Sequence, residues 1–93
     1  MKRQAIETGR VVRFEIAAQP GSQVFLAGTF NGWNTTATPL KDNPDSGHFK
    51  TVLRLPVGTH EYKFVINGAW TVDPQSAHCA PNPYGSLNSV RHV

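Results

Sequence analysis

A tryptophan and a lysine on one predicted hairpin are the residues of this 93-residue chain whose types and spacing indicate a binding chemistry. Residues 62–66 form an alternating run, and Asn67-Gly68 follows it. This dipeptide favours a two-residue type I′ turn, because Asn and Gly both tolerate positive φ. The resulting register pairs Val65 with Trp70, so Lys63 and Trp70 share the outward face of the hairpin. A flat indole suits the C–H face of a sugar ring, and a neighbouring donor suits its rim of hydroxyls.

The opposite face of the same strand carries bulky apolar side chains, which we assign to the core: Tyr62, Phe64 and Ile66. The same register pairs Ile66 with Ala69 and Lys63 with Val72. A large apolar ring is rarely left in solvent without a function. Tryptophan contributes strongly to contact energies at binding surfaces, so an outward indole indicates a binding face. A neutral, hydroxyl-rich ligand would also explain why the predicted binding face is not strongly charged.

Length and composition favour a single domain, residues 1–93, in which the polar residues 1–9 are expected to be flexible. Hydrophobic residues make up 39% of the chain against 16% charged residues, so the chain can bury a core. Cys79 is the only cysteine, which excludes an intrachain disulfide. Polar residues rather than an apolar run follow Met1-Lys2-Arg3, so we predict no signal peptide, no membrane partner and a cytoplasmic location.

Short apolar runs separated by turn residues predict an all-β chain, because no stretch has a helical period. Strands are expected over residues 10–18, 23–28, 48–55, 62–66 and 88–93. Residues 41–47 are expected to form a loop, and the proline-containing residues 72–85 a long irregular loop. We predict an immunoglobulin-like β-sandwich, with an OB-type barrel as the alternative.

Neither metal binding nor catalysis has a supporting pattern. His78 and Cys79 are adjacent, which is not a ligand spacing, and the other histidines are dispersed. A glycosidase needs two carboxylates across the scissile bond, whereas the six carboxylates here fall mostly in turns or on solvent faces. Asp73-Pro74 more simply begins a turn. We therefore expect a protein that is not an enzyme and has no metal and no cofactor.

Five stretches of the chain resemble, in the same order, those of carbohydrate-binding module family 48: residues 24–33, 58–64, 68–70, 73–74 and 85–90. The chain is most similar to the glycogen-binding domains of AMP-activated protein kinase beta subunits. It is also similar to the early-set domains that precede the catalytic domains of isoamylases and branching enzymes. The resemblance runs over residues 11–93 and implies an early-set sandwich that binds α-1,4-linked glucans, namely glycogen, starch and maltooligosaccharides.

The resemblance also implies roles for individual residues. Trp33 and Trp70 would stack on successive glucose rings, while Lys63 and Asn88 would hydrogen-bond to sugar hydroxyls. A small hydroxyl residue of the family falls two positions before that asparagine, and a leucine of the family is replaced by a tyrosine that could itself stack. The carbohydrate-binding residues predicted in this way are Trp33, Lys63, Trp70, Tyr84, Ser86 and Asn88.

Each of these residues also has a purely structural interpretation. Trp33 could fill one end of the core, Trp70 could serve only as a cross-strand partner, and Lys63 could be an ordinary solvated strand lysine. Asn88 and Ser86 follow a glycine and could cap a turn.

Two other functions remain open from the sequence. The same patch or a sheet edge could dock a separate kinase or glycan-active enzyme, which would make the chain a protein-interaction module or a regulatory subunit. The net charge of +3 and a pI near 9.4 permit a nucleic-acid partner, but the basic residues form no stripe, so none is expected.

Overall fold

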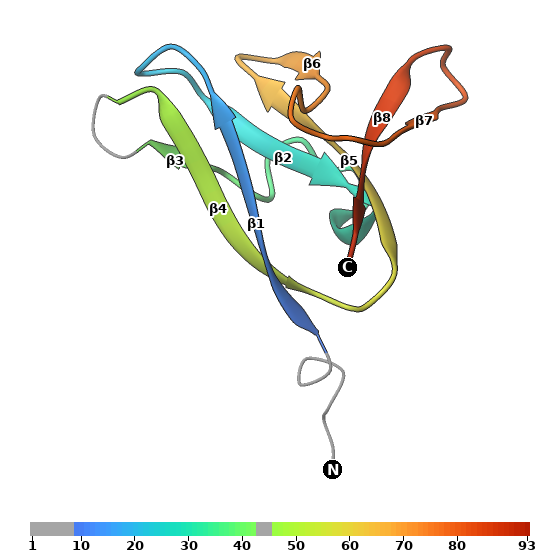
Figure 1. Cartoon of the computed structure of the whole chain (residues 1–93). Helices are drawn as coiled ribbons and strands as arrows, with labels where there is room; N and C mark the ends of the chain where they lie inside the picture. The colour runs from blue at the N-terminus through green and yellow to red at the C-terminus, as the bar shows by residue number, and fades with distance from the viewer. Residues whose placement is uncertain (1–8, 43–45) are drawn as a thin grey trace.

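Two antiparallel sheets lie face to face in the computed structural model of this chain, which describes residues 9–42 and 46–93 (Figure 1). The first sheet has the strand order β1-β4-β3 and is formed by β1 (Arg10–Ala17), β4 (His48–Leu55) and β3 (Lys41–Asp42). The second has the order β2-β5-β8-β7 and is formed by β2 (Val24–Gly28), β5 (Thr59–Ile66), β8 (Leu87–His92) and β7 (Cys79–Pro81). Strand β6 (Ala69–Thr71) pairs with β5, and a 3₁₀ helix, η2 (Thr29–Asn31), follows β2.

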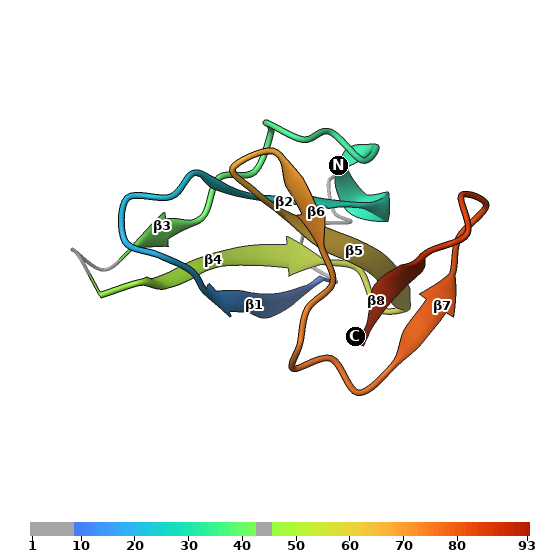
Figure 2. The same cartoon turned by 90° about the horizontal axis from the view of Figure 1, so that it is seen from above.

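The predicted all-β sandwich is confirmed, since the strands form two separate antiparallel sheets that share one core. The alternative of an OB-type barrel is wrong, because such a barrel needs one sheet that closes on itself. Seen from above, β1 and β4 lie on one side of the molecule, while the turn between β7 and β8 projects at the far end (Figure 2).

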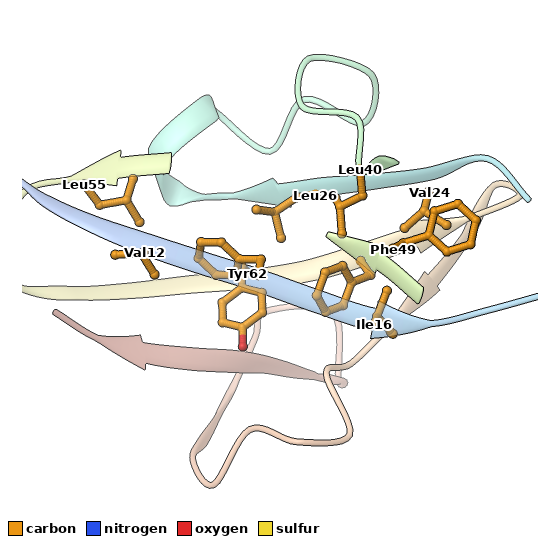
Figure 3. Close-up of a cluster of buried hydrophobic side chains, with 10 residues drawn as sticks. Val12, Ile16, Val24, Leu26, Leu40, Phe49, Leu55 and Tyr62 are labelled. Carbon is orange, nitrogen blue, oxygen red and sulfur yellow. The ribbon is translucent and has the colours of Figure 1, made fainter. Parts of the chain in front are cut away.

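The core fills the space between the two sheets, with side chains from β1, β2, β4 and β5 (Figure 3). Alternate residues of β1, Val12, Phe14 and Ile16, point into it, as the alternation predicted. The Phe14 ring packs edge-on against Tyr62, with ring centroids 4.9 Å apart and an interplanar angle of 73°. Each such buried apolar side chain contributes about 1.5–3 kcal/mol to the stability of the fold. The same packing fixes which face of β5 points away from the core.

The predicted hairpin is confirmed in its turn and in its first pairs. Asn67 and Gly68 both have positive φ, 50° and 85°, and Val65 lies opposite Trp70. The ladder ends at Phe64 and Thr71, so the predicted pairing of residues 63 and 72 does not form. From residue 62 towards its N-terminus, this edge of β5 is paired with β8 instead. The chain therefore leaves the hairpin one pair earlier than expected.

The region expected to be one long irregular loop contains a strand. Residues 79–81 pair with β8 as β7, a strand too short to show an alternating pattern. Residues 41–42, also expected in a loop, form β3 beside β4. Val65 was expected on the outward face and does lie there, yet it is buried, because the large residues Phe25 and Trp70 flank it in register.

The polar N-terminus that was expected to be flexible lies, over residues 1–8, outside the part of the chain that the structure describes. Within residues 9–42 and 46–93, no helix has the length and apolar character needed to cross a membrane.

Candidate functional site

A cleft of about 770 Å³ opens on the outward face of the second sheet, between η2, the hairpin of β5 and β6, and the turn between β7 and β8. All six residues predicted to bind carbohydrate line it. Four further residues of the lining were not predicted. The full lining is Thr29, Trp33, Glu61, Lys63, Trp70, Asn82, Pro83, Tyr84, Ser86 and Asn88.

The two tryptophans lie beside each other at one side of this cleft. Their ring centroids are 6.4 Å apart and their ring planes are tilted by 51°. Trp70 is half exposed, and Trp33 is partly buried but is not part of the core cluster. The interpretation of Trp33 as a core residue is therefore wrong. Two indole faces from segments far apart in the sequence meet on one surface.

The backbone around Trp33 is held in an unusual conformation. Gly32 and Trp33 both have positive φ, 67° and 61°, which is costly for a bulky side chain. The Trp33 amide donates to the carbonyl oxygen of Gly28 at 2.9 Å. Oδ1 of Asn31 accepts from the Gly28 amide at 3.0 Å, and Nδ2 of Asn31 donates to the Leu26 carbonyl at 2.9 Å. The hydrogen bonds of Asn31 thus hold the turn against the end of β2. They offset the energetic cost of the positive-φ backbone, the conformation in which the Trp33 indole lies at the cleft.

Lys63 faces the cleft but is largely covered, with 9% of its surface exposed. Its amine reaches the turn between β7 and β8. Long cationic side chains often bury their aliphatic part while the charged end reaches a polar partner. Nζ donates to Oγ of Ser86 at 2.9 Å. The interpretation of Lys63 as an ordinary solvated lysine is wrong.

Asn82, which was not predicted, organises the turn between β7 and β8. Its Oδ1 accepts from the backbone amides of Tyr84 and Ser86, at 2.9 and 3.2 Å. Its Nδ2 donates to Ser86 Oγ at 2.7 Å and to Asn88 Oδ1 at 3.0 Å. Asparagine is common in turns that contain proline, so the sequence alone gave no reason to single out Asn82. The folded turn shows that its side chain joins two of the predicted sugar-binding residues, Ser86 and Asn88.

Asn88 is buried, and its amide is bonded at both ends. Oδ1 accepts from Asn82, and Nδ2 donates to Oε1 of Glu61 at 2.9 Å. Ser86 and Asn88 thus belong to one hydrogen-bonded network with Glu61 and Lys63. The side chain that caps the turn is that of Asn82, which accepts the turn amides. The signal that could have revealed Glu61 is its position two residues before Lys63 on the same strand face.

Tyr84 stands at the tip of this turn with 92% of its surface exposed. Its backbone amide is bonded to Asn82, while the ring has no such restraint among the hydrogen bonds of the described residues. The structure places Tyr84 at the rim of the cleft, and its role as a stacking residue stays a prediction.

Asp73 lies two residues after the end of β6, the strand that carries Trp70, and is bonded to the core and to β8. Its Oδ2 accepts a 2.6 Å hydrogen bond from the Tyr62 hydroxyl, and its amide donates to Ser89 Oγ at 2.7 Å. Oδ1 accepts from the Gln75 amide at 2.9 Å, which confirms the predicted turn. Burial raises the pKa of Tyr62 to about 12, and the hydrogen bond to the Asp73 carboxylate adds to this shift.

Residues 9–42 and 46–93 contain no group of three His, Cys, Asp or Glu side chains that could hold a metal ion. His78 packs edge-on against His92, with ring centroids 5.1 Å apart. Cys79 has a free thiol and is exposed on β7, where the sheet ends.

A β-sandwich that presents two tilted indole faces beside a floor of hydrogen-bonding side chains defines a carbohydrate-binding module. Residues 12–93 match the family described as the glycogen recognition site of AMP-activated protein kinase, and the chain belongs to this family. The resemblance noted in five stretches of the sequence is thereby confirmed.

Relatives of known identity agree with this family. The chain is 37% identical over 76 residues to 5'-AMP-activated protein kinase subunit beta-2 of Mus musculus, which is 82% of this chain and 27% of that protein. It is 36% identical over 73 residues to subunit beta-1 of Sus scrofa, 78% of this chain and 56% of that protein. For subunit beta-1 of Bos taurus the identity is 37% over 73 residues, 78% of this chain and 25% of that protein. The chain therefore spans about a quarter of the mouse and bovine relatives.

Proposed function

We propose that the cleft of this carbohydrate-binding module binds α-1,4-linked glucans of the glycogen and starch type. The contacting residues are Trp33, Lys63, Trp70, Tyr84, Ser86 and Asn88. The observation that carries the proposal is the pair of indole rings 6.4 Å apart and tilted by 51° on one surface.

The tilt between the two indole planes supports a curved ligand. Successive rings of an α-1,4-glucan turn relative to one another because the chain is helical, whereas a β-1,4-glucan forms a flat ribbon. Two tilted planes can each stack on one ring of a curved chain, while a flat ribbon would lie against one indole and diverge from the other. The buried amine of Lys63 and the amide of Asn88 would then meet the hydroxyl rim.

The affinity expected of this open site is modest. Two stacking faces and a few hydrogen bonds must offset the cost of immobilising a flexible oligosaccharide, so we expect a Kd on the order of micromolar to millimolar. Multivalent binding along a branched polysaccharide would raise the apparent affinity.

Tryptophan fluorescence titrated with maltoheptaose tests this proposal. We expect a saturable change for the wild-type chain, none with a cellulose-type oligosaccharide, and at least a tenfold loss of affinity in Trp70→Ala. Val57→Ala, a change at an exposed residue outside the cleft, is the matched control and should bind as the wild type does. No response up to millimolar maltoheptaose would overturn the proposal.

The proposal does not include catalysis. Glycosidases hold two carboxyl groups roughly 5–9.5 Å apart across the scissile bond. Among the described residues that line the cleft, Glu61 is the one carboxylate. Prolonged incubation with maltoheptaose should therefore release no reducing ends, as measured by a reducing-sugar assay.

We further propose that this domain works beside a catalytic protein, as part of a regulatory subunit. The names of its relatives, subunits of a protein kinase, support this. Co-purification from native extract with and without excess maltoheptaose would test it and would show whether sugar and partner compete. A cytoplasmic setting stays a prediction, supported by the single cysteine.

A further inference from the structure

Glu61 lies on the floor of the cleft, on the same outward face of β5 as Lys63. The two residues are two positions apart on one strand, so their Cα atoms are roughly 7 Å apart. Within the described part of the chain, the ion pairs of Glu15 with Arg13 and His48 lie elsewhere, and none joins Glu61 to a cation. The one side chain that donates to Glu61 there is Asn88, to Oε1. A carboxylate has about four acceptor sites, so most of this capacity is free.

The donor and the acceptor of each hydrogen bond on the floor of the cleft can be assigned, because the residues at the two ends of the network, Lys63 and Glu61, have fixed roles. Lys63 can only donate and a carboxylate can only accept. Oδ1 of Asn82 already accepts two backbone amides, so its Nδ2 donates to Ser86 and Asn88. Asn88 must then donate to Glu61. Ser86 Oγ accepts from both Lys63 and Asn82, which leaves its proton free to donate.

The floor therefore offers donors in excess. Lys63 retains further N–H groups and Ser86 its hydroxyl proton, whereas Glu61 holds the largest free acceptor capacity. A sugar hydroxyl both donates and accepts, so a floor of donors alone would leave protons of the bound sugar without partners. Each internal residue of an α-1,4-glucan keeps adjacent free hydroxyls on C2 and C3. One can accept from Lys63 while its neighbour donates to Glu61.

We propose that Glu61 is a further glucan-contacting residue, which accepts a hydrogen bond from one hydroxyl of the vicinal C2–C3 pair of a glucose ring while Lys63 donates to the other. This inference rests on the proposed function of the cleft. It makes the site selective for a ring whose two adjacent secondary hydroxyls are free, in addition to the shape selection made by the indoles.

Two substitutions separate a contact with the sugar from a role in positioning Asn88. In Glu61→Gln the side-chain oxygen can still accept from Asn88, but the second group becomes a donor. Glu61→Ala removes both functions. We expect about a tenfold loss of maltoheptaose affinity in Glu61→Gln, measured by isothermal titration calorimetry. Glu15→Gln, which makes the same change of charge on the other sheet, should bind within twofold of the wild type.

If Glu61→Gln binds as the wild type does, Glu61 makes no contact with the sugar and the inference is overturned, even if Glu61→Ala binds weakly. A modified ligand provides a second, independent test. Methylation of O2 and O3 on a cyclic maltoheptaose removes the hydroxyl proton that Glu61 accepts and also adds bulk at the oxygen that Lys63 contacts. The part of the loss that is due to Glu61 is absent in Glu61→Gln, so methylation should weaken binding to the wild type more than binding to Glu61→Gln. Equal losses in both proteins would also overturn the inference.

The wild-type titration separates this inference from the function on which it rests. If wild-type protein does not bind unmodified maltoheptaose, the proposed function itself fails. If it binds and loses affinity in Trp70→Ala but not in Glu61→Gln, the function stands and the role of Glu61 does not.

Discussion

The hydroxyl of Tyr62 donates a 2.6 Å hydrogen bond to Oδ2 of Asp73, and this bond joins the core to the segment that follows the hairpin. Both residues are buried, Tyr62 in the core cluster and Asp73 at the start of the next turn. The bond therefore links the packing between the sheets to the position of the hairpin that presents Trp70.

Removing this hydroxyl in Tyr62→Phe should destabilise the domain by about 1–3 kcal/mol, because the buried carboxylate of Asp73 loses a donor. The melting temperature should fall by roughly 5–15 °C for a domain of this size. Differential scanning calorimetry measures the change. Tyr84→Phe, at an exposed hydroxyl, is the control and should stay within about 0.5 kcal/mol of the wild type. Equal effects of the two changes would contradict the prediction.

Alkaline pH should destabilise the wild type through the same tyrosine. The pKa of Tyr62 is raised to about 12 in the folded protein, whereas an unfolded tyrosine has a pKa of about 10. Between these values the unfolded state has lost a proton that the folded state keeps. This contribution to stability is therefore complete below about pH 10 and is lost as the pH rises towards 12.

Urea unfolding at a series of pH values from 8 to 11.5 would measure this effect. The free energy of unfolding of Tyr62→Phe should fall less steeply above pH 10 than that of the wild type. Parallel curves would show that Tyr62 does not contribute.

Asn31→Ala should loosen the turn that carries Trp33. The substitution removes the bonds of Asn31 to the Gly28 amide and the Leu26 carbonyl, which hold the turn in its positive-φ conformation. We expect a loss of about 1–2 kcal/mol in stability and a several-fold loss of maltoheptaose affinity. Asn34→Ala, which removes exposed hydrogen bonds to Thr36, is the matched control. An affinity unchanged in Asn31→Ala would show that the position of Trp33 does not depend on this residue.

Substitutions of Asn82 should distinguish its two functions. Asn82→Asp keeps an oxygen to accept from the Tyr84 and Ser86 amides but loses the donor to Ser86 and Asn88, whereas Asn82→Ala loses both. We expect both variants to bind maltoheptaose about three- to tenfold more weakly, and only Asn82→Ala to increase amide hydrogen exchange in the turn. Wild-type affinity in Asn82→Asp would mean that the donor is not needed.

Local signals made much of the fold and part of the site predictable. The alternating run before Asn67-Gly68 specifies both the strand and its turn, because turn chemistry and side-chain period act over a few residues. The outward orientation of Lys63 and Trp70 follows from that register alone. By contrast, β7 is three residues long and is stabilised by its pairing with β8, so no local pattern marks it.

The sequence by itself determined an all-β chain and one hairpin register that turns Lys63 and Trp70 outward, because these depend on period and turn residues. The other four candidate sugar-binding residues followed from the resemblance of short motifs to a known family. Only the tertiary structure decided that Trp33 lies beside Trp70, that Asn82 joins Ser86 to Asn88, and that Glu61 is an acceptor on the floor of the cleft. These contacts join segments that are distant along the chain or lie in different strands and turns. They form when the core packs and fixes where each turn lies over the sheet.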